Sequence, residues 1–417
     1  MTWDFTPPAP SELNDRQVRL EGNHLTGKRI ALLVTGSIAA MKAPLIARAL
    51  RKQGADVVAF ASSEALRYVT VEALAWSTTH EVVTKLTPAA EHLSDEEPFD
   101  AYLVAPATYN TINKIRFGIA DGTVTAAVAS AIGRMEQGRG KVLIAPTMHG
   151  SLHNSILTES LRVLAGLGVE MIAPRQDYGK DNLPDEMDIV VAVCRLLSES
   201  PLKGVPILVT GGPTPVPIDG IRRLTNRFTG RLGQEIAKTC YLRGAEVYLI
   251  QGNSGHSPPS FLPYAIADTY EDYQRLVLQC LSEKDYRFGI FSAAVADYRP
   301  EKVYSGKMPS GKSDLTISLV ATDKVIQQVR EKFPELALVS FKYQENVSHE
   351  GLMGIAEERL QLGDLAVVAN RREEAVSVGE QVAYWVMREE EPKRWVGKRG
   401  IAEGIVGELE KEVGVRR

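Results

Sequence analysis

Short apolar runs that end in a glycine, serine or proline turn alternate with amphipathic segments along most of this chain. RIALLVTGS at 29–37 is typical of the runs, and IAAMKAPLIARALRKQG at 38–54 is typical of the segments that follow them. Such runs indicate strands buried on both faces, and the longer segments indicate crossover helices. The alternation predicts an α/β fold with a mainly parallel, doubly wound sheet covered by helices on both faces.

The alternation is interrupted once, at PLKGVP in residues 201–206, and then restarts. A chain of 417 residues is long enough for two domains. We therefore expect two three-layer domains, at 28–200 and 207–417, with 201–206 as the linker and 1–27 as a polar, weakly ordered extension. Near the end, QVAYWVMRE and RWVG predict a hairpin, and IAEGIVGELEKEV predicts a terminal helix.

The composition argues against several kinds of partner and location. Lys and Arg number 48 against 52 Asp and Glu, for a net charge of −4, and no basic stripe indicates nucleic acid. No apolar run approaches the ~18 residues needed to cross a bilayer, and residues 1–17 lack the apolar core of a secretion signal. Three scattered cysteines (Cys194, Cys240 and Cys280) argue against a disulfide framework or a zinc site. We expect a cytoplasmic protein that binds small molecules, not nucleic acid or a membrane.

Ligands of doubly wound sheets bind beyond the carboxyl ends of the strands. In the first half, Gly36 and Ser37 follow one predicted strand and Ser62 follows the next. Thr108 and Asn110 follow the strand that ends in APAT. Hydroxyl groups beside helix N-termini suit a phosphate group. The Thr-Gly-Ser turn alone is weak evidence, because it is not a G-x-G-x-x-G sequence.

In the second half, VTGGPTPVPIDGIRRLTNRFTGRLG at 209–233 is the most informative stretch. It begins as a strand, breaks at Gly211 and Gly212, and leads into a helix near its end. A strand, a glycine turn and a helix start together favour an anion site. An ordinary turn would explain the glycines alone, but not Arg222 and Asn226 at fixed offsets from them.

The 209–233 stretch resembles the opening of phosphopantothenate–cysteine ligases, where Gly-Pro-Thr, Asp, Arg, Asn and two glycines follow in this order. FSAAVADYRP at 291–300 resembles that family's AAVADY segment. APATYNTINKIRFGIAD at 105–121 is similar to the APAT-x-NT-x-x-K-x-x-x-GIAD signature of flavin-binding cysteine decarboxylases. From about residue 28 to about residue 412, the chain resembles the fusion of phosphopantothenoylcysteine decarboxylase with this ligase, from coenzyme A biosynthesis. The resemblance implies a flavodoxin-like flavoprotein domain followed by a Rossmann-like ligase domain.

For the first half, the resemblance implies FMN as the cofactor. The residues that it places at the cofactor are Gly36, Ser37, Ser62, Ala105, Thr108 and Asn110. It also implies a catalytic histidine. His92 stands thirteen residues before Ala105, as the family's active-site histidine stands before its APAT sequence.

Two departures concern the decarboxylase chemistry. His149 stands where the family has an Asn expected to hold the substrate carboxylate. The family's flap carries a Cys that protonates the reduced product, whereas PRQDYGKDNLPDEMD at 174–188 has none, and Cys194 comes too late in the sequence to replace it. General acid assistance is worth ~100- to 10,000-fold, so we expect little decarboxylation unless Asp177 or Tyr178 supplies the proton.

For the second half, the resemblance implies that 4′-phosphopantothenate is joined to cysteine through an acyl-nucleotide made from CTP or ATP with Mg2+. Asn226 would grip the acyl-nucleotide and Lys307 the triphosphate, as catalytic residues, while Asp297 would bind the nucleotide. The family's bacterial KxKK sequence is not intact, so Lys312 is only a possible second cation. The other implied contacts are Gly211, Gly212, Thr214, Arg222, Phe341 and Asn370.

Several alternatives remain. The chain could be fully bifunctional with a substitute flap acid, or its first half could serve only as a flavin-binding assembly module. A generic dinucleotide-dependent oxidoreductase is disfavoured, because no G-x-G-x-x-G sequence is followed by an acidic residue ~20 positions on. The sequence does not decide between CTP and ATP, although the fusion favours CTP. The resemblance also implies a homo-oligomer, with ligase dimers and flavoprotein trimers.

Overall fold

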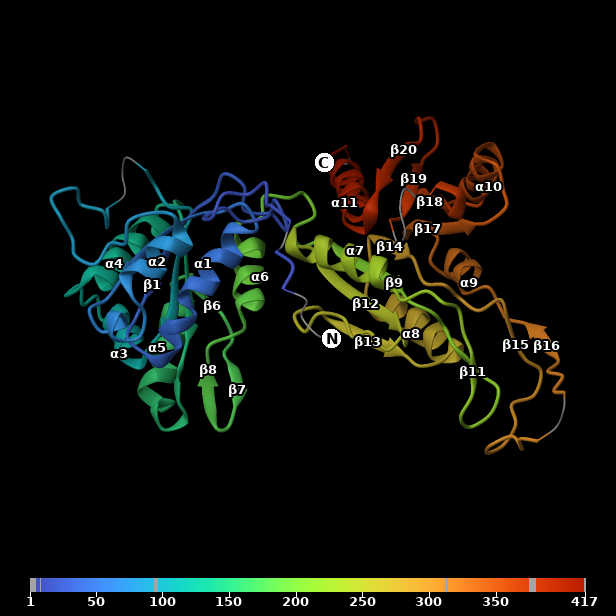
Figure 1. Ribbon diagram of the computed structural model, residues 1–417, viewed down its shortest axis with the longest axis horizontal. Helices are drawn as coiled ribbons and strands as arrows, with labels where there is room; N and C mark the ends of the chain where they lie inside the picture. The colour runs from blue at the N-terminus through green and yellow to red at the C-terminus, as the bar shows by residue number, and fades with distance from the viewer. Residues whose placement is uncertain (1–4, 8, 94–96, 312–313, 375–379, 416–417) are drawn as a thin grey trace. The chain divides into compact units, whose positions relative to one another are not determined.

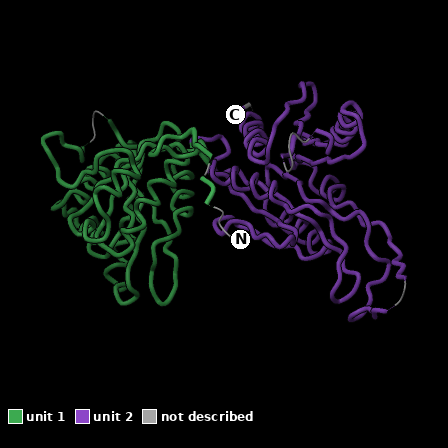
Figure 2. Tube along the Cα trace, in the orientation of Figure 1, with its two compact units in different colours: residues 1–198 green, residues 199–417 purple. Residues whose placement is uncertain are grey.

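The computed structural model describes residues 5–7, 9–93, 97–311, 314–374 and 380–415. The chain divides into two compact units, residues 1–198 and residues 199–417 (Figure 2). Each unit has its own principal sheet and its own hydrophobic core.

The first unit is built on a five-stranded parallel sheet in the order β2-β1-β3-β4-β6 (Figure 1). In β1 to β4, every residue is buried except the first residue of β1, β2 and β4. Burial of this kind is expected of a sheet covered on both faces, and it confirms the predicted doubly wound architecture. The strands are β1 Arg29–Val34, β2 Asp56–Ala61, β3 Ala101–Ala107, β4 Lys141–Pro146 and β6 Glu170–Met171.

Helices cover both faces of this sheet. Figure 1 shows α3, α4 and α5 on one side and α1 and α6 on the other, and α1 also packs against α2. The helices are η1 Ile38–Lys42, α1 Ala43–Arg51, η2 Ala65–Arg67, α2 Val71–Thr78, α3 Tyr109–Arg116, α4 Thr123–Glu136, η3 Gly150–Leu152, α5 Ser155–Gly166 and α6 Glu186–Leu197.

A small antiparallel sheet lies beside the main sheet of the first unit. Its order is β5-β8-β7, formed by Met148–His149, Lys180–Asn182 and Arg175–Asp177. Strands β7 and β8 form a hairpin whose turn residues, Tyr178 and Gly179, both have positive φ (50° and 66°). The stretch that lacks the family's flap cysteine is therefore a β-hairpin paired to the strand that carries His149.

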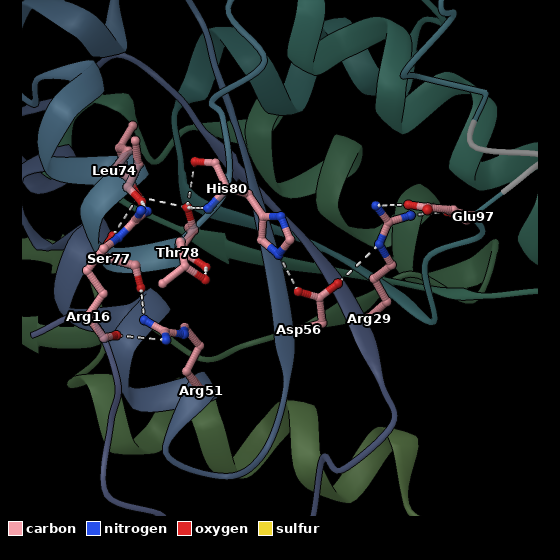
Figure 3. Close-up of polar contacts among 11 residues, drawn as sticks. Arg16, Arg29, Arg51, Asp56, Leu74, Ser77, Thr78, His80 and Glu97 are labelled. Atoms are coloured by element: carbon pink, nitrogen blue, oxygen red, sulfur yellow. Dashed lines mark hydrogen bonds and ion pairs between the residues drawn. The ribbon is translucent and has the colours of Figure 1, made fainter. Parts of the chain in front are cut away.

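Part of the N-terminal extension packs on the first unit, which corrects the expectation of a weakly ordered lead-in. Leu25 is fully buried, and its N–H donates to the carbonyl of Gln53 at 2.8 Å. Arg16 donates to the carbonyl of Ala75 at 2.9 Å, and Arg51 donates to the carbonyl of Arg16 at 3.0 Å (Figure 3). These contacts join the extension to α1, α2 and the turn after α1.

The second unit is built on an eight-stranded sheet in the order β13-β12-β9-β14-β17-β18-β19-β20. The strands from β13 to β18 are parallel, and β19 and β20 add to them as an antiparallel hairpin, as predicted from the sequence. The edge strand β13 was not predicted. The strands are β9 Pro206–Gly211, β12 Glu246–Gly252, β13 Tyr264–Ala267, β14 Phe288–Phe291, β17 Ala337–Gln344, β18 Ala366–Arg371, β19 Val382–Val386 and β20 Lys393–Val396.

Alternate residues of β9 face different cores of the second unit. Ile207 and Val209 pack with α7, α11 and Trp385, whereas Leu208 packs with α8, α9 and Tyr273. None of the helices within the described ranges is long and apolar enough to cross a membrane. The helices are α7 Arg231–Leu242, α8 Tyr270–Glu283, α9 Val325–Lys332, α10 His349–Gln361, η4 Arg372–Glu374 and α11 Gly397–Val415.

Two small ribbons extend beyond the edge of the second sheet (Figure 1). One pairs β10 Val216–Pro217 with β11 Arg223–Leu224, and the other pairs β15 Tyr298–Pro300 with β16 Leu319–Ala321. The ribbons come from the loops after β9 and β14, two neighbouring parallel strands. They therefore bring the two stretches with ligase-like sequences together at the carboxyl edge of the sheet.

Candidate functional site

The first unit contains a cavity of about 940 Å³ at the carboxyl ends of β1, β2, β3 and β4. Sites for cofactors and small ligands commonly measure ~300–1,000 Å³. Of the six residues predicted at the cofactor, Gly36, Ser37, Ser62, Thr108 and Asn110 line this cavity. The sixth residue, Ala105, is fully buried inside β3 and is not among the lining residues.

Three helix starts lie at the wall of this cavity. The Ser37 hydroxyl accepts a hydrogen bond from the N–H of Ala39 at the start of η1, at 3.2 Å. The Thr108 hydroxyl accepts one from the N–H of Thr111 in the first turn of α3, at 3.3 Å. Gly122 precedes α4. The unpaired N–H groups of first helical turns carry partial positive charge, so this wall suits an anionic group such as a phosphate.

Close backbone packing shapes the same wall. A Cβ atom added at Gly36 would lie 2.4 Å from Cβ of Glu64, so any side chain at this position would force the two strand ends apart. The Thr35 hydroxyl donates to the carbonyl of Pro106 at 2.7 Å and accepts from the N–H of Thr108 at 3.3 Å. Thr35 was not predicted as a site residue, because its role depends on β1 and β3 being neighbours.

Charged residues of both signs line the cavity. Lys114 contacts Asp121 at 2.6 Å, and this hydrogen bond lowers the pKa of the Asp121 carboxyl group. Glu64, Lys180 and Asp181 also line the cavity. Since these charges largely balance, the helix starts and hydroxyl groups are the main attraction for an anion.

His149 lines the cavity from β5, next to the flap hairpin. Its Nδ1 lies 3.0 Å from the Ser151 hydroxyl, and Lys180 of β8 is directly opposite it in register. The side chain of Asp181 is buried, and its Oδ2 lies 2.5 Å from Nδ1 of His153. Lys180 and Asp181 were not predicted, because the pairing of β5 with β8 that brings them to the cavity is non-local.

The two proton donors considered from the sequence lie elsewhere. Asp177 and Tyr178 line a smaller neighbouring cavity of about 510 Å³, and neither lines the larger one. Tyr178 is 89% exposed at the tip of the hairpin. Lys180 and Asp181 line both cavities, so they are better placed for the larger one.

The structure does not bring His92 into the cavity. Arg134, in the last turn of α4, donates to the carbonyl of Leu93 at 3.2 Å and holds this loop there. The start of α4 lines the cavity, and Arg134 is about 16 Å further along the helix axis at 1.5 Å per residue. Nδ1 of His92 is buried and has no hydrogen-bond partner among the residues that the structure describes. The sequence spacing did not reveal this contact, which depends on the tertiary fold.

In the second unit, the glycine turn after β9 is tightly packed against a buried glutamine. Gly212 has φ of 80° and Gly230, at the start of α7, has φ of 74°. A Cβ atom at these positions would lie 2.7 Å and 2.1 Å from Nε2 of the fully buried Gln251. With Gly211 at the end of β9, these residues form a narrow backbone-lined turn at the start of a 12-residue helix. Such a turn suits close approach of a phosphate group.

Asn226 and Thr214 are both held by the loop that follows β14. The amide Nδ2 of Asn226 donates to the carbonyl of Ala294 at 3.0 Å, which leaves its amide oxygen available. Thr214 is buried, and its hydroxyl accepts from the N–H of Ala296 at 2.8 Å. Thr214 therefore fixes the loop, and its predicted contact with a ligand lacks support in this geometry.

Arg222 is anchored by a buried carboxylate. Its Nη1 donates to Oδ2 of Asp219 at 2.9 Å, and its side chain is 41% exposed. Backbone N–H groups of Arg222 and Ile221 hold the pKa of Asp219 down, at about 2. The guanidinium group is thus fixed at one edge and open to solvent at the other.

A group of charges surrounds Asp297 at the carboxyl ends of β14 and β17. Asp297 forms an ion pair with Lys324. Burial lowers the pKa of Lys342, with a further contribution from Arg359, and burial also lowers the pKa of Arg359. The sequence analysis identified Asp297 but missed these three cations, which come from separate elements.

The remaining predicted ligase residues occupy different environments. Lys307 is exposed on the excursion that contains β15 and β16. Phe341 is half-buried in β17 against the core, and Asn370 is buried in β18 opposite Tyr343. Lys312, the possible second cation, lies outside the described residues.

The described residues contain no group of three or more His, Cys, Asp or Glu side chains placed to hold a metal ion. None of the three cysteines forms a disulfide, and Cys194 and Cys240 are buried.

Comparison with known proteins identifies both units. The family model described as the DNA/pantothenate metabolism flavoprotein C-terminal domain matches residues 202–412, and the model described as flavoprotein matches residues 18–198. A crystal structure of the DNA/pantothenate metabolism flavoprotein from Streptococcus pneumoniae is 26% identical, with a TM-score of 0.46, and covers 50% of this chain and 100% of its own.

Two curated relatives match this chain over most of both lengths. The coenzyme A biosynthesis bifunctional protein CoaBC of Thermococcus kodakarensis is 36% identical over 401 residues, which cover 93% of this chain and 96% of the relative. The protein of that name from Bacillus subtilis is 30% identical over 363 residues, 83% of this chain and 86% of the relative. The chain belongs to the family of coenzyme A biosynthesis bifunctional proteins, with a flavoprotein domain followed by a ligase-type domain.

Proposed function

We propose that the second unit joins 4′-phosphopantothenate to cysteine at the expense of a nucleoside triphosphate, in the cytoplasm. The observation that carries this proposal is the meeting of two ligase-like loops at the carboxyl edge of one sheet. Asn226 of the first loop is hydrogen-bonded to Ala294 of the second, 68 residues further along the chain.

In this reaction, a carboxylate oxygen of 4′-phosphopantothenate forms a bond to the α-phosphorus of CTP or ATP, and pyrophosphate leaves. The cysteine amine then attacks the acyl carbon, the nucleoside monophosphate leaves, and the amine loses a proton. Arg222 and Lys307 would stabilise phosphate charge, and the free amide oxygen of Asn226 would orient the acyl-nucleotide. Mg2+ would enter with the triphosphate. The fusion with a flavoprotein unit favours CTP over ATP.

The other proposed ligase contacts come from the glycine turn after β9 and from the ends of β14, β17 and β18. Gly211 and Gly212 would accept a phosphate against the backbone of their turn, and Asp297 would bind the nucleotide once its ion pair with Lys324 is rearranged. Phe341 and Asn370 lie on the neighbouring strands β17 and β18, whose carboxyl ends meet at the same edge.

For the first unit, we propose that FMN binds in the 940 Å³ cavity. The fit rests on three helix starts, the hydroxyl groups of Ser37, Ser62 and Thr108, and the close packing that requires glycine at 36. When bound, the flavin would supply two-electron redox chemistry to a thiol substrate. Asn110 would contact the cofactor, and His149 would face the substrate carboxylate in place of an amide.

Decarboxylation of the ligation product is the second proposed activity, and we expect it to be slow. The hairpin that takes the place of the flap carries no thiol, and its tip residue Tyr178 does not line the cavity. His92 can serve this cavity only if its loop leaves Arg134 or if another copy of the chain supplies it. A homo-oligomer, with ligase dimers and flavoprotein trimers, is part of this proposal. A first unit that only binds flavin and assembles the protein is the alternative.

The test is to incubate the purified protein with phosphopantothenate, cysteine, Mg2+ and either CTP or ATP, and to identify the products by mass. The expected product is phosphopantothenoylcysteine, with CMP or AMP and pyrophosphate. Absence of this product with both nucleotides would reject the ligase assignment. Accumulation of phosphopantetheine would instead show that the first unit decarboxylates efficiently.

A further inference from the structure

The side chain of Asp219 is fully buried, and its two carboxylate oxygens accept four hydrogen bonds. Its Oδ1 accepts from the backbone N–H groups of Ile221 and Arg222, at 2.8 and 2.6 Å. Its Oδ2 accepts from Nη1 of Arg222 at 2.9 Å and from the N–H of Met308 at 3.0 Å. The last of these donors is 89 residues away in the sequence.

Two backbone hydrogen bonds join the same two segments just before Lys307. The N–H of Gly220 donates to the carbonyl of Gly306 at 2.8 Å, and the N–H of Tyr304 donates to the carbonyl of Ile218 at 3.0 Å. With the bond from Met308 to Asp219, both chain neighbours of Lys307 are held by the turn at 218–222.

The turn at 218–222 and the segment before Lys307 lie so close together that a methyl group added at Gly220 would require one of them to shift. A Cβ atom at Gly220 would lie 3.2 Å from the carbonyl oxygen of Gly306. Position 220 therefore offers a second way to disturb the junction, independent of the carboxylate.

We propose that Asp219 is a positioning residue of the ligase site, whose carboxylate fixes the guanidinium group of Arg222 and the backbone that carries Lys307 in one arrangement. The inference rests on the proposed function, because both cations are assigned there to phosphate groups. Asp219 is buried and would not touch the substrate. Asp219 would hold the two loops in one arrangement. Arg222 and Lys307 would then be in place before the charged substrate binds, and binding would not have to order them.

The first test compares Asp219→Asn with the unmodified chain in steady-state ligation. Asn keeps the shape of the side chain but replaces one acceptor oxygen with a donor, which must then face an N–H group. A misplacement of ~1 Å can cost about 100-fold, so kcat/KM for CTP should fall about 100-fold, with a rise in KM for CTP. Because cysteine reacts after the acyl-nucleotide has formed, its KM should not change. Asp272→Asn is the matched control: Asp272 also pairs with an arginine three residues on, but at the start of α8.

The second test measures binding of CTP with Mg2+ by calorimetry, in Asp219→Asn, in Lys307→Ala and in the double variant. Because Asp219 acts partly through Lys307, the losses of CTP affinity should add incompletely: the double variant should bind more weakly than Lys307→Ala, through Arg222, but less weakly than the sum of the two single losses. Gly220→Ala should raise KM for CTP in the same way as Asp219→Asn, which keeps the proposal testable if Asp219→Asn does not fold.

A lower kcat with an unchanged KM for CTP, or additive losses of CTP affinity, would overturn the proposal and leave Asp219 as a structural residue. Amide hydrogen exchange provides a readout apart from activity: the Met308 amide should exchange faster in Asp219→Asn than in the unmodified protein. If the unmodified protein makes no phosphopantothenoylcysteine, the proposed function fails, whereas CTP binding and Met308 exchange still decide the role of Asp219. Unchanged Met308 exchange would overturn it.

Discussion

The cavity of the first unit and the charged edge of the second unit are built in opposite ways. The cavity is lined mainly by hydroxyl groups, amides and helix starts that follow β1 to β4. Hydrogen bonds such as that from Thr35 to Pro106 connect the ends of these strands. The edge of the second unit presents Arg222 and Lys324 on loops, each paired with a carboxylate of its own chain. The first arrangement suits a cofactor that stays bound, and the second suits charged substrates that enter and leave.

The two sites also differ in how their proposed functional groups are held. In the first unit the cavity is enclosed by the strand ends, but neither the hairpin tip Tyr178 nor His92, both considered for catalysis, lines it. In the second unit the arrangement of the proposed reactive groups depends on two loops, which meet through Asp219, through Asn226 and Thr214, and through backbone hydrogen bonds. Substitutions in the first unit can therefore change proton transfer without changing cofactor binding, and substitutions in the second unit can change substrate binding through the loops.

The largest expected effect concerns decarboxylation by the first unit. Replacing the hairpin at 175–182 with a cysteine-containing flap should raise CO2 release from phosphopantothenoylcysteine by ~100-fold or more, because a general acid is worth ~100- to 10,000-fold. The control is the same graft with serine in place of the cysteine. Rapid CO2 release by the unmodified chain would contradict the comparison and direct attention to His149, Lys180 and Asp181.

The next effect concerns the ligase residues. Asn226→Asp and Lys307→Ala should each lower the ligation rate ~100- to 1,000-fold, since one donor or cation at a developing charge is worth that much. Flavin content and the thermal unfolding midpoint should stay the same. Gln361→Glu and Lys302→Ala are the matched exposed controls. Near-normal turnover in both site variants would show that these positions do not carry the reaction.

A smaller effect is expected at the flavin cavity. The purified protein should be yellow, and Thr108→Ala should weaken FMN binding by about 2- to 10-fold, the equivalent of one neutral hydrogen bond. Thr158→Ala, on α5 and not among the residues that line the cavity, should bind FMN normally. Ligation should continue in both variants. A colourless protein that does not take up FMN on reconstitution would remove the cofactor from the proposal.

The smallest effect is a pH dependence in the second unit. The pKa of Asp219 is lowered in the folded chain to about 2, mainly by the N–H groups of Arg222 and Ile221, from 3.8 for an unperturbed carboxyl group. Its stabilising contribution is therefore complete above pH ~4 and is lost as the pH falls from ~4 towards ~2. The difference in free energy of unfolding between the unmodified chain and Asp219→Asn should shrink over this range. A difference that grows on acidification would contradict the assigned shift.

The elements of both sheets were largely predictable because burial on both faces leaves a continuous apolar run, as in RIALLV of β1 and PILVTG of β9. The edge strand β13 was missed because only one of its four residues, Ala267, is buried, so the apolar signal is weak. Five cavity residues were found because they directly follow strand ends. His92 does not line the cavity of its own chain, and the sequence does not show that the neighbouring Leu93 contacts Arg134.

The residues that sequence analysis missed share one property: their neighbours are distant in the chain. Lys324 meets Asp297 across 27 positions, and Met308 meets Asp219 across 89. No local periodicity encodes such pairs, since each requires that two loops fold against each other first. The motif around 209–233 includes Asp219, but the sequence does not show that this carboxylate meets Met308 of a distant loop.

Because β8 pairs with β5 on one side, the length of the β7–β8 hairpin cannot change freely. Successive residues of a strand face opposite sides, and here Asp181 is buried while its neighbour Lys180 is exposed. Inserting or deleting one residue within β8 would exchange these two positions, placing a lysine where the carboxylate meets His153. Changes of two residues, or changes confined to the turn at Tyr178 and Gly179, would preserve both faces. Relatives with longer or shorter hairpins are therefore expected to differ in even steps along the strands.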